Sequence, residues 1–229
     1  MQINLILLAA GKGQRYQAST SGQVGCATIK QLADIGGKPM IVDRVEKLKP
    51  LLINPDINNI YVTLGANKNV IKAVLPQDIS VIDSQHWSQG MGHSLAESVQ
   101  SIKAQSSHVL IALADQAMIS TEHYQNLLSA SKKQPNKIIA TLCDEQLMAP
   151  AIFPEKYFPL LIKLQGNKGA GLLLKSHALQ TDAIACTTAK FDINTLADLE
   201  QIRQQLDHSK QENNLHQNTP SHCQNLEPV

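Results

Sequence analysis

Aromatic residues are scarce in this sequence, making up 3% of its 229 positions, and the formal net charge is only +1. Hydrophobic residues still account for 43% of the chain, so a globular core is expected, and it must be mainly aliphatic. No basic run interleaved with aromatics occurs, and the charge is close to balanced. Nucleic acid and an anionic membrane are therefore not expected as partners.

Cysteines are few and widely separated. The four stand at Cys26, Cys143, Cys186 and Cys223, without the paired spacing of a zinc site or a thiol redox motif. This usage fits a reducing compartment, and no stretch approaches the roughly 20 apolar residues that a membrane span needs. The apolar start lacks a basic n-region and runs directly into Gly-Lys-Gly, which favours a buried strand over a signal peptide. We therefore predict a cytoplasmic protein.

Two kinds of apolar segment alternate along the chain as far as about residue 206. Short apolar runs typical of buried strands are separated by segments whose apolar residues recur at helical spacing. This alternation predicts one α/β domain with a mostly parallel sheet covered by helices on both faces. Strands are expected at 3–9, 59–64, 79–82, 108–113, 137–142, 150–153 and 183–187. Helices are expected from residue 39, at 67–75, after residue 92, after residue 115, at 157–164, at 170–177 and up to 206, with a long loop from 10 to about 38.

The composition changes at residue 207. From there the chain is mainly Gln, Asn, Ser and His, with almost nothing to bury, so burial cannot offset the entropy lost on ordering. We expect residues 1–206 to form the domain and 207–229 to be a disordered polar tail. The tail histidines His208, His216 and His222 are interpreted as inert rather than as a metal site.

A glycine-containing segment, LILLAAGKGQR, joins the first expected strand to the loop that follows. Gly11 and Gly13 leave room for backbone N–H groups to approach an anion closely. Lys12 and Arg15 add positive charge, and an arginine can grip phosphate through two parallel hydrogen bonds. A dinucleotide fingerprint would need a third glycine where Tyr16 stands, and a P-loop would need Gly-Lys-Ser/Thr. The segment is a candidate phosphate cradle of another kind.

Several blocks together resemble one family. LAAGKGQR and KQLADIGGKPMI resemble the signature of nucleotidyltransferases with a glycosyltransferase-A-like Rossmann domain. Further blocks are similar to those of the molybdenum cofactor cytidylyltransferases, which are MobA-like NTP transferases: GMGHSLAESV, LIALADQAMIS, APAIFPEKYFPLLIKLQGNKGAGLLL and DINTLADLEQI. The blocks stand in family order and cover about residues 3–203. The resemblance implies a single Rossmann-like domain of that superfamily.

The implied reaction is transfer of a nucleoside monophosphate from an NTP to a phosphate acceptor, with release of pyrophosphate. Ala-Ala-Gly in the first loop favours CTP, and the family favours the molybdopterin-bound molybdenum cofactor as acceptor. Two alternatives stay open. One is a sugar- or alditol-phosphate nucleotidyltransferase; the other is a catalytically weak maturation protein that binds the cofactor and delivers it to an apo-molybdenum hydroxylase.

The resemblance also implies a role for individual residues. Arg15, Lys30 and Asp115 are the implied catalytic residues, with Mg²⁺ as cofactor. Asp115 and Asn194 are the implied metal ligands, and Asp192 is a possible substitute for Asn194 or a supporting group. The implied nucleotide-binding set comprises Leu8, Ala9, Ala10, Gly11, Gly13, Arg15, Lys30 and Ser94.

These residue types suit the chemistry. A phosphate monoester is already largely anionic at neutral pH, so its attack on a triphosphate needs cations and preorganised N–H donors rather than a general base. Magnesium prefers carboxylate oxygens together with substrate phosphates, which suits an aspartate at a strand end.

Simpler interpretations remain for several of these residues. Asp115 could cap the following turn, and Asn194 with Thr195 could cap the last helix. Lys38 is a second candidate for the phosphate contact. Trp87 could stack on a ring or simply pack, and His93 could face water.

The sequence departs from the family pattern mainly on the acceptor side. Ala117 replaces a proline, Met148 and Ala149 stand where Gly-His is common, and Asn167 replaces an aspartate. The segment between Arg15 and Lys30 is also longer than usual. These departures leave the identity of the acceptor undecided, but they do not affect the expected reaction class.

Overall fold

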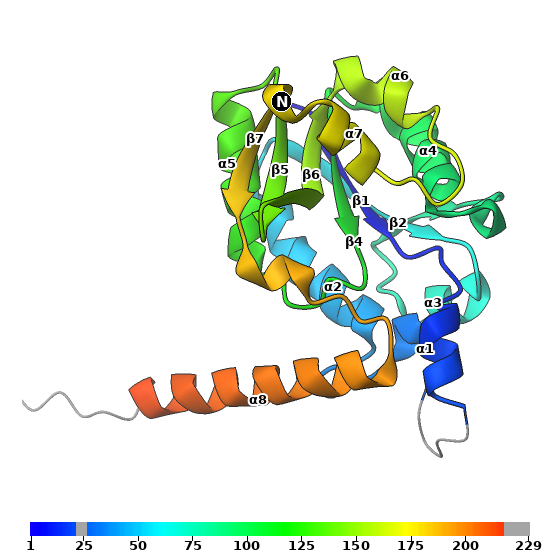
Figure 1. Ribbon diagram of the computed structural model, residues 1–229, viewed down its shortest axis with the longest axis vertical. Coiled ribbons are helices and arrows are strands. Elements are labelled where there is room, and N and C mark those ends of the chain that lie inside the picture. The colour runs from blue at the N-terminus through cyan, green and yellow to red at the C-terminus, as the bar shows by residue number, and fades with distance from the viewer. Residues whose placement is uncertain (22–26, 218–229) are drawn as a thin grey trace, which may run out of the picture.

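The computed structural model describes residues 1–21 and 27–217, with side chains as far as residue 206. Its centre is a seven-stranded sheet in the order β3-β2-β1-β4-β6-β5-β7 (Figure 1). β6 runs antiparallel to both of its neighbours, and every other pair is parallel. The strands are β1 Ile3–Leu8, β2 Ile57–Leu64, β3 Ser80–Asp83, β4 His108–Leu113, β5 Ile138–Cys143, β6 Gln146–Pro154 and β7 Thr181–Ala185. The predicted α/β fold with a mostly parallel sheet is confirmed.

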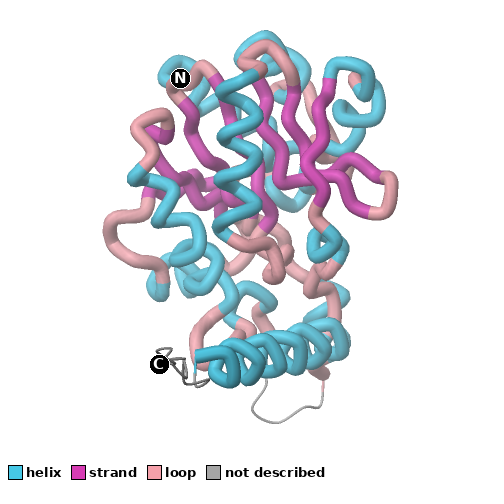
Figure 2. Tube along the Cα trace, turned by 90° about the vertical axis from the view of Figure 1, so that its left-hand side faces the viewer, coloured by secondary structure: helices cyan, strands magenta, loops and turns pink. Residues whose placement is uncertain are grey.

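Helices cover the two faces of the sheet (Figure 2). One face packs under α2 (Met40–Leu48), α3 (Lys68–Val74) and α5 (Thr121–Lys133), and the other under α4 (Met91–Ile102), α6 (Phe158–Leu161) and α7 (Gly171–Ser176). β1 is buried along its whole length because its side chains feed both cores alternately, as expected for a central parallel strand. That explains its continuous apolar run.

A two-residue hairpin turn accounts for the one antiparallel strand. Asp144 and Glu145 join β5 to β6, and both have positive φ, at 44° and 62°. Such tight turns connect antiparallel strands only, whereas a parallel connection needs a crossover of a dozen or more residues. β6 is therefore reversed between β4 and β5.

A third, smaller core lies beyond the carboxyl ends of the parallel strands. There α1 (Gln14–Ser19) packs against the beginning of α8 (Leu196–Gln217), with Tyr16 buried between them and 1% exposed. Ser19 Oγ accepts a 2.9 Å hydrogen bond from the N–H of Leu196, which ties the two helices together. Figures 1 and 2 show α8 lying across this end of the domain.

The structure corrects one expectation. The long loop expected from residue 10 to 38 contains α1 and a 3₁₀ turn, Lys30–Leu32. α8 runs to Gln217, past the domain boundary expected at residue 206, while the division into a domain and a polar tail stays a prediction. Residues 22–26 and 218–229, with Cys26, Cys223 and His222, lie outside the described part of the chain.

Short 3₁₀ segments complete the framework. Besides Lys30–Leu32 they are Lys49–Ile53, Trp87–Gln89, Lys103–Gln105, Glu155–Tyr157, Ala178–Gln180 and Thr187–Lys190. Among the described residues, no helix has the length and apolar character needed to cross a membrane.

Candidate functional site

A cavity of about 430 Å³ opens where β1 and β4 end. In parallel α/β sheets this edge is where ligands bind, and the volume is in the range of small-molecule sites. Every site residue assigned from the sequence lines it: Leu8, Ala9, Ala10, Gly11, Gly13, Arg15, Lys30, Ser94, Asp115 and Asn194. The structure thus brings the whole set together, while the roles of its members stay predictions.

The glycine loop is held by its carbonyl groups. Gln31 Nε2 donates to the carbonyl oxygens of Ala9 and Gly11, at 2.9 and 2.8 Å. The carbonyl of Ala10 accepts from the N–H of Ala66 at 2.9 Å. The backbone N–H groups of residues 11–13 donate to no atom of the described residues, so they are available to an anion.

Close packing explains the second glycine of the loop. Gly13 has a φ of 67°, and a Cβ added there would lie 3.0 Å from Cβ of Lys30. Glycine therefore lets the chain turn into α1 while Lys30 stays against the loop. Gln31, which holds the loop, was not identified from the sequence, because an amide bonded to distant carbonyls leaves no spacing signal.

Two of the three cationic side chains that line the cavity, Lys30 and Arg15, are each paired with a predicted metal ligand. Lys30 Nζ lies 2.7 Å from Oδ2 of Asp115, and both side chains are mostly buried, at 13% and 25% exposed. Arg15 Nη2 donates to Oδ1 of Asn194 at 2.9 Å. The side chain of Asp115 therefore faces the cavity as a ligand would.

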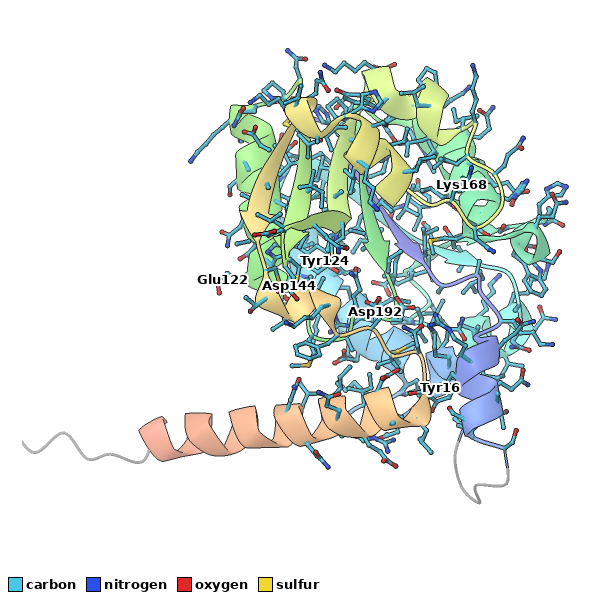
Figure 3. The ribbon with its side chains drawn as sticks, viewed as in Figure 1. Tyr16, Glu122, Tyr124, Asp144, Lys168 and Asp192 are labelled. Carbon is cyan, nitrogen blue, oxygen red and sulfur yellow. The ribbon has the colours of Figure 1, made fainter. Side chains whose placement is uncertain are left out.

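A second carboxylate lies beside Asp115. Figure 3 shows Asp192 below the end of β4, between the sheet and α8. Burial first, and then the charge of Asp115, raise the pKa of Asp192 to about 6. Its buried Oδ1 has no hydrogen-bond partner among the described residues. An unsatisfied carboxylate oxygen next to another carboxylate is a favourable place for a divalent cation.

The residues present fit magnesium. Asp115 and Asp192 supply carboxylate oxygens and Asn194 an amide oxygen, all hard ligands. The described residues contain no group of three or more His, Cys, Asp or Glu suited to hold a metal by themselves. Magnesium keeps waters and substrate phosphates in its shell, so a partial protein shell suits it better than a closed cage would.

The family model for the MobA-like NTP transferase domain matches residues 5–182 of this chain. The chain belongs to this family. The predicted family resemblance is thereby confirmed, and it covers the glycine loop, Lys30, Ser94 and Asp115. The matched segment stops before Asn194, which lines the same cavity, and before Asp192, whose pKa is raised in part by the charge of Asp115.

Relatives and solved structures agree with this assignment. The bifunctional protein GlmU of Legionella pneumophila (strain Lens) is 31% identical over 157 residues, which is 66% of this chain and 30% of that protein. The chain thus spans less than a third of the length of this curated relative.

Two solved structures share the fold. A nucleotidyl transferase from Methanothermobacter thermautotroptrophicus superposes with a TM-score of 0.75 at 16% identity, covering 91% of this chain and 99% of that one. Molybdopterin-guanine dinucleotide biosynthesis protein A from Archaeoglobus fulgidus gives 0.59 at 14% identity, covering 91% and 100%.

In this MobA-like domain, two buried polar side chains fix the turn that carries Asp115. Arg44, whose side chain is 2% exposed, donates to the carbonyls of Gln116 and Ile119 at 2.9 and 3.1 Å. Gln116 Nε2 donates to the carbonyls of Ala149 and Ala189, at 3.0 and 3.2 Å. Neither role was predicted, since both depend on long-range contacts with backbone carbonyls.

The GMG block is interlocked with the loop before α7. The N–H of Gly92 donates to the carbonyl of Gly166 at 2.8 Å, and the N–H of Gly166 donates to Nδ1 of His93 at 3.0 Å. A Cβ on Gly90 would lie 2.4 Å from the backbone of Gly166. His93 therefore holds two loops together. Asn167, from the second loop, lines the cavity.

Of the remaining candidates, Trp87 and Ser94 line the cavity and Lys38 does not. Trp87 lines the cavity and lies over Gly65, where a Cβ would come within 2.4 Å of its side chain. Ser94 Oγ accepts from Ser84 Oγ at 3.0 Å. Lys38 instead pairs with Glu46, at 2.5 Å on the surface, and does not line the cavity.

The Asn194 side chain takes no part in capping the last helix and lines the cavity instead. The N–H groups of Asn194 and Thr195 donate to Oδ2 of Asp198, at 2.9 and 2.8 Å, and the N–H of Asp198 donates to Oγ1 of Thr195 at 3.3 Å. This is a capping box, in which Thr195 and not Asn194 is the capping side chain.

Proposed function

We propose that this protein transfers CMP from CTP to the terminal phosphate of molybdopterin-bound molybdenum cofactor and releases pyrophosphate. The observation that carries the proposal is the meeting, in one cavity, of a glycine loop with free N–H groups, three cationic side chains and the carboxylate of Asp115, with Asp192 close to that carboxylate. That set stabilises a transferring phosphoryl group and contains no acid–base pair dedicated to proton transfer.

The reaction forms a bond between an acceptor phosphate oxygen and the α-phosphorus of the triphosphate. The bond from the α-phosphorus to the bridging oxygen of pyrophosphate breaks, and that oxygen takes the electron pair. The acceptor phosphate is already largely anionic at neutral pH, so no residue has to remove a proton. The main barrier is therefore electrostatic.

Each chain residue in this scheme has one task. The loop N–H groups of residues 11–13 bind phosphate oxygens, and Arg15 and Lys30 neutralise the β- and γ-phosphates. Asp115 and Asp192, with Asn194, would hold magnesium, which neutralises charge on the phosphates when it is bound.

The choice of CTP rests on the first loop. Ala10, 5% exposed and on the cavity wall, stands where the guanosine-specific branch of the family favours glycine. Measuring pyrophosphate release with CTP, GTP, ATP and UTP separates the donors. A clear preference for GTP would overturn the cytidine assignment and leave the reaction class intact.

The reaction class has its own test. Replacing Asp115 with Asn should lower magnesium-dependent turnover by about 10²-fold or more, because one ligand and one negative charge are lost at the transferring group. Asp144→Asn is a matched control, since Asp144 pairs with Lys190 on the surface. Absence of turnover in the unaltered protein, together with unchanged cofactor binding in Asp115→Asn, would instead favour the non-catalytic cofactor-delivery role for an apo-molybdenum hydroxylase.

A second candidate is transfer to a sugar or alditol phosphate. The long segment between Arg15 and Lys30 and the neutral Asn167 on the cavity wall favour it. Supplying molybdopterin cofactor and a panel of sugar and alditol phosphates with the preferred triphosphate distinguishes the acceptors.

A further inference from the structure

Two of the four cysteines meet at the end of two neighbouring strands. β5 and β7 run parallel (Figure 1), and Leu142 and Ala185 are their last paired residues. Cys143 and Cys186 are the next positions along the two strands, and the N–H of Cys186 donates to the carbonyl of Leu142 at 2.9 Å. Both cysteines pack on the core under α5, so their side chains lie side by side on one face of the sheet.

The two sulfur atoms also approach the same short segment. Sγ of Cys143 lies 3.6 Å from the carbonyl oxygen of Thr187, and Sγ of Cys186 lies 3.3 Å from Oγ1 of Thr188. Neighbouring strands are about 4.8 Å apart, which is within the roughly 4.4–6.8 Å between Cα atoms that a disulfide spans. Cys186 follows the last residue of β7, where the chain leaves the sheet, so a small shift there brings the two sulfur atoms into bonding distance.

We propose that Cys143 and Cys186 are a modification site, which forms a reversible disulfide by reaction with a low-molecular-weight disulfide such as glutathione disulfide. Both are free thiols in the structure. Their separation in the sequence hides the pair, which is created by the pairing of β5 with β7. Under reducing conditions the pair remains as two thiols, and a rise in the concentration of the small disulfide joins them.

Exposure sets the order of the two chemical steps. Cys143 is 2% exposed, whereas Cys186 is partly exposed, so the small disulfide reaches Cys186 first. The deprotonated sulfur of Cys186 attacks one sulfur of glutathione disulfide, whose S–S bond breaks, and one glutathione leaves as a thiolate and takes up a proton. The deprotonated sulfur of Cys143 then attacks Sγ of Cys186, and the second glutathione leaves in the same way. Two protein thiols are oxidised, and one glutathione disulfide is reduced to two thiols.

The new bond connects the two segments that hold Gln116. The side-chain amide of Gln116 donates to the carbonyls of Ala149 and Ala189, at 3.0 and 3.2 Å. Ala149 lies in β6, which follows Cys143 after the hairpin turn, and Ala189 lies in the 3₁₀ segment that follows Cys186. A link between the two cysteines therefore restrains both segments and, through Gln116, the turn after β4.

The test follows the thiols of the full-length protein. The folded protein is incubated with glutathione and glutathione disulfide at several ratios, quenched with N-ethylmaleimide in denaturant, and digested for mass spectrometry. We expect a peptide in which Cys143 is linked to Cys186, and its loss when excess glutathione is restored. Alkylation of both cysteines at every ratio, or linkage of either one to Cys26 or Cys223 instead, would overturn the proposal.

Single variants distinguish the attacking sulfur from the second one. Cys143→Ala should stop at the mixed disulfide of Cys186 with glutathione, because the second sulfur is missing. Cys186→Ala should take up about tenfold less glutathione at Cys143 in the same time, since that thiol is buried. Equal uptake at the remaining cysteine in the two variants would overturn the proposed order. Melting curves check that each reduced variant is folded, and the linked peptide of the unaltered protein decides the proposal without them.

Hydrogen–deuterium exchange measures the restraint on the two segments and needs no substrate. Oxidation should slow amide exchange in residues 144–149 and 186–189 by about threefold or more. Cys186→Ala, treated with the same glutathione mixture, is the control and should show no such change. Unchanged exchange in the oxidised protein, or equal slowing in the control, would overturn the effect assigned to the disulfide.

Discussion

Asp192 should destabilise the ligand-free protein at neutral pH, and its replacement by Asn should stabilise it. Burial and the neighbouring Asp115 raise the pKa of Asp192 from its ordinary value of 3.8 to about 6. Each pKa unit corresponds to about 1.4 kcal/mol, which sets a ceiling of about 3 kcal/mol. Because Asp192 is only half-buried, screening by water reduces the expected effect to about 1 kcal/mol.

The pH dependence follows from the direction of the shift. With a folded-state pKa above the unfolded one, the folded state holds the proton more strongly, so this contribution to stability is fully present below about pH 4. It is lost as the pH rises towards about 6 and stays lost above. Asn cannot ionise, so Asp192→Asn should melt about 2–4 °C higher at pH 8 and show no such gain near pH 4.

Scanning calorimetry between pH 4 and 8, with EDTA present, measures this difference. Asp78→Asn is the control, because hydrogen bonding to Lys49 lowers the pKa of that exposed carboxyl and its loss should bring no gain at pH 8. A pH-independent gain for Asp192→Asn, or a lower melting temperature at pH 8, would refute the reasoning. With magnesium and CTP added, the order should reverse, since the unaltered protein gains more from the bound cation.

Three further changes test other parts of the structure. Gly90→Ala should lower the free energy of unfolding by about 2 kcal/mol, measured by urea unfolding, and should impair turnover. The reason is that Gly90 has a φ of 117° and that the new Cβ would clash with the backbone of Gly166. Gly171→Ala is the control, and it should have neither effect because the space around Gly171 is open. Arg44→Met should reduce the free energy of unfolding by about 3 kcal/mol by leaving buried carbonyls unbonded, and a change below 1 kcal/mol would contradict this role. Deleting residues 210–229 should leave activity intact, and failure of the shortened chain to fold would show that the end of α8 contributes to the domain.

The sheet was largely predictable from the sequence. β1 and β4 are continuous apolar runs that end at glycine or aspartate, and their observed bounds lie within a residue of the expected ones. α1 was missed because six residues hold too few turns to show a period, and only Tyr16 is buried. α8 runs past the domain boundary expected at residue 206, where a polar composition does not distinguish an exposed helix from a disordered tail.

The cavity residues that belong to a recognisable sequence motif could be predicted. The loop, Lys30 and Asp115 come from blocks with recognisable spacing, and the structure places them together. Arg44 escaped detection because its task is a set of hydrogen bonds to carbonyls more than 70 residues away. Asp192 was ranked below Asn194, since only the fold reveals that its oxygen is buried and unpartnered beside Asp115.

The bond between Arg15 and Asn194 joins residues 179 positions apart. A ribosome has therefore made nearly all of the domain before it adds Asp192 and Asn194, two of the residues proposed to hold the cation. The glycine loop and Lys30 emerge early, and Asp115 follows, but Asp192 and Asn194 arrive only as α8 begins and docks on Ser19. During synthesis the residues of the proposed phosphate cradle are thus made well before those of the proposed metal site, which the ribosome adds only near the end of the domain.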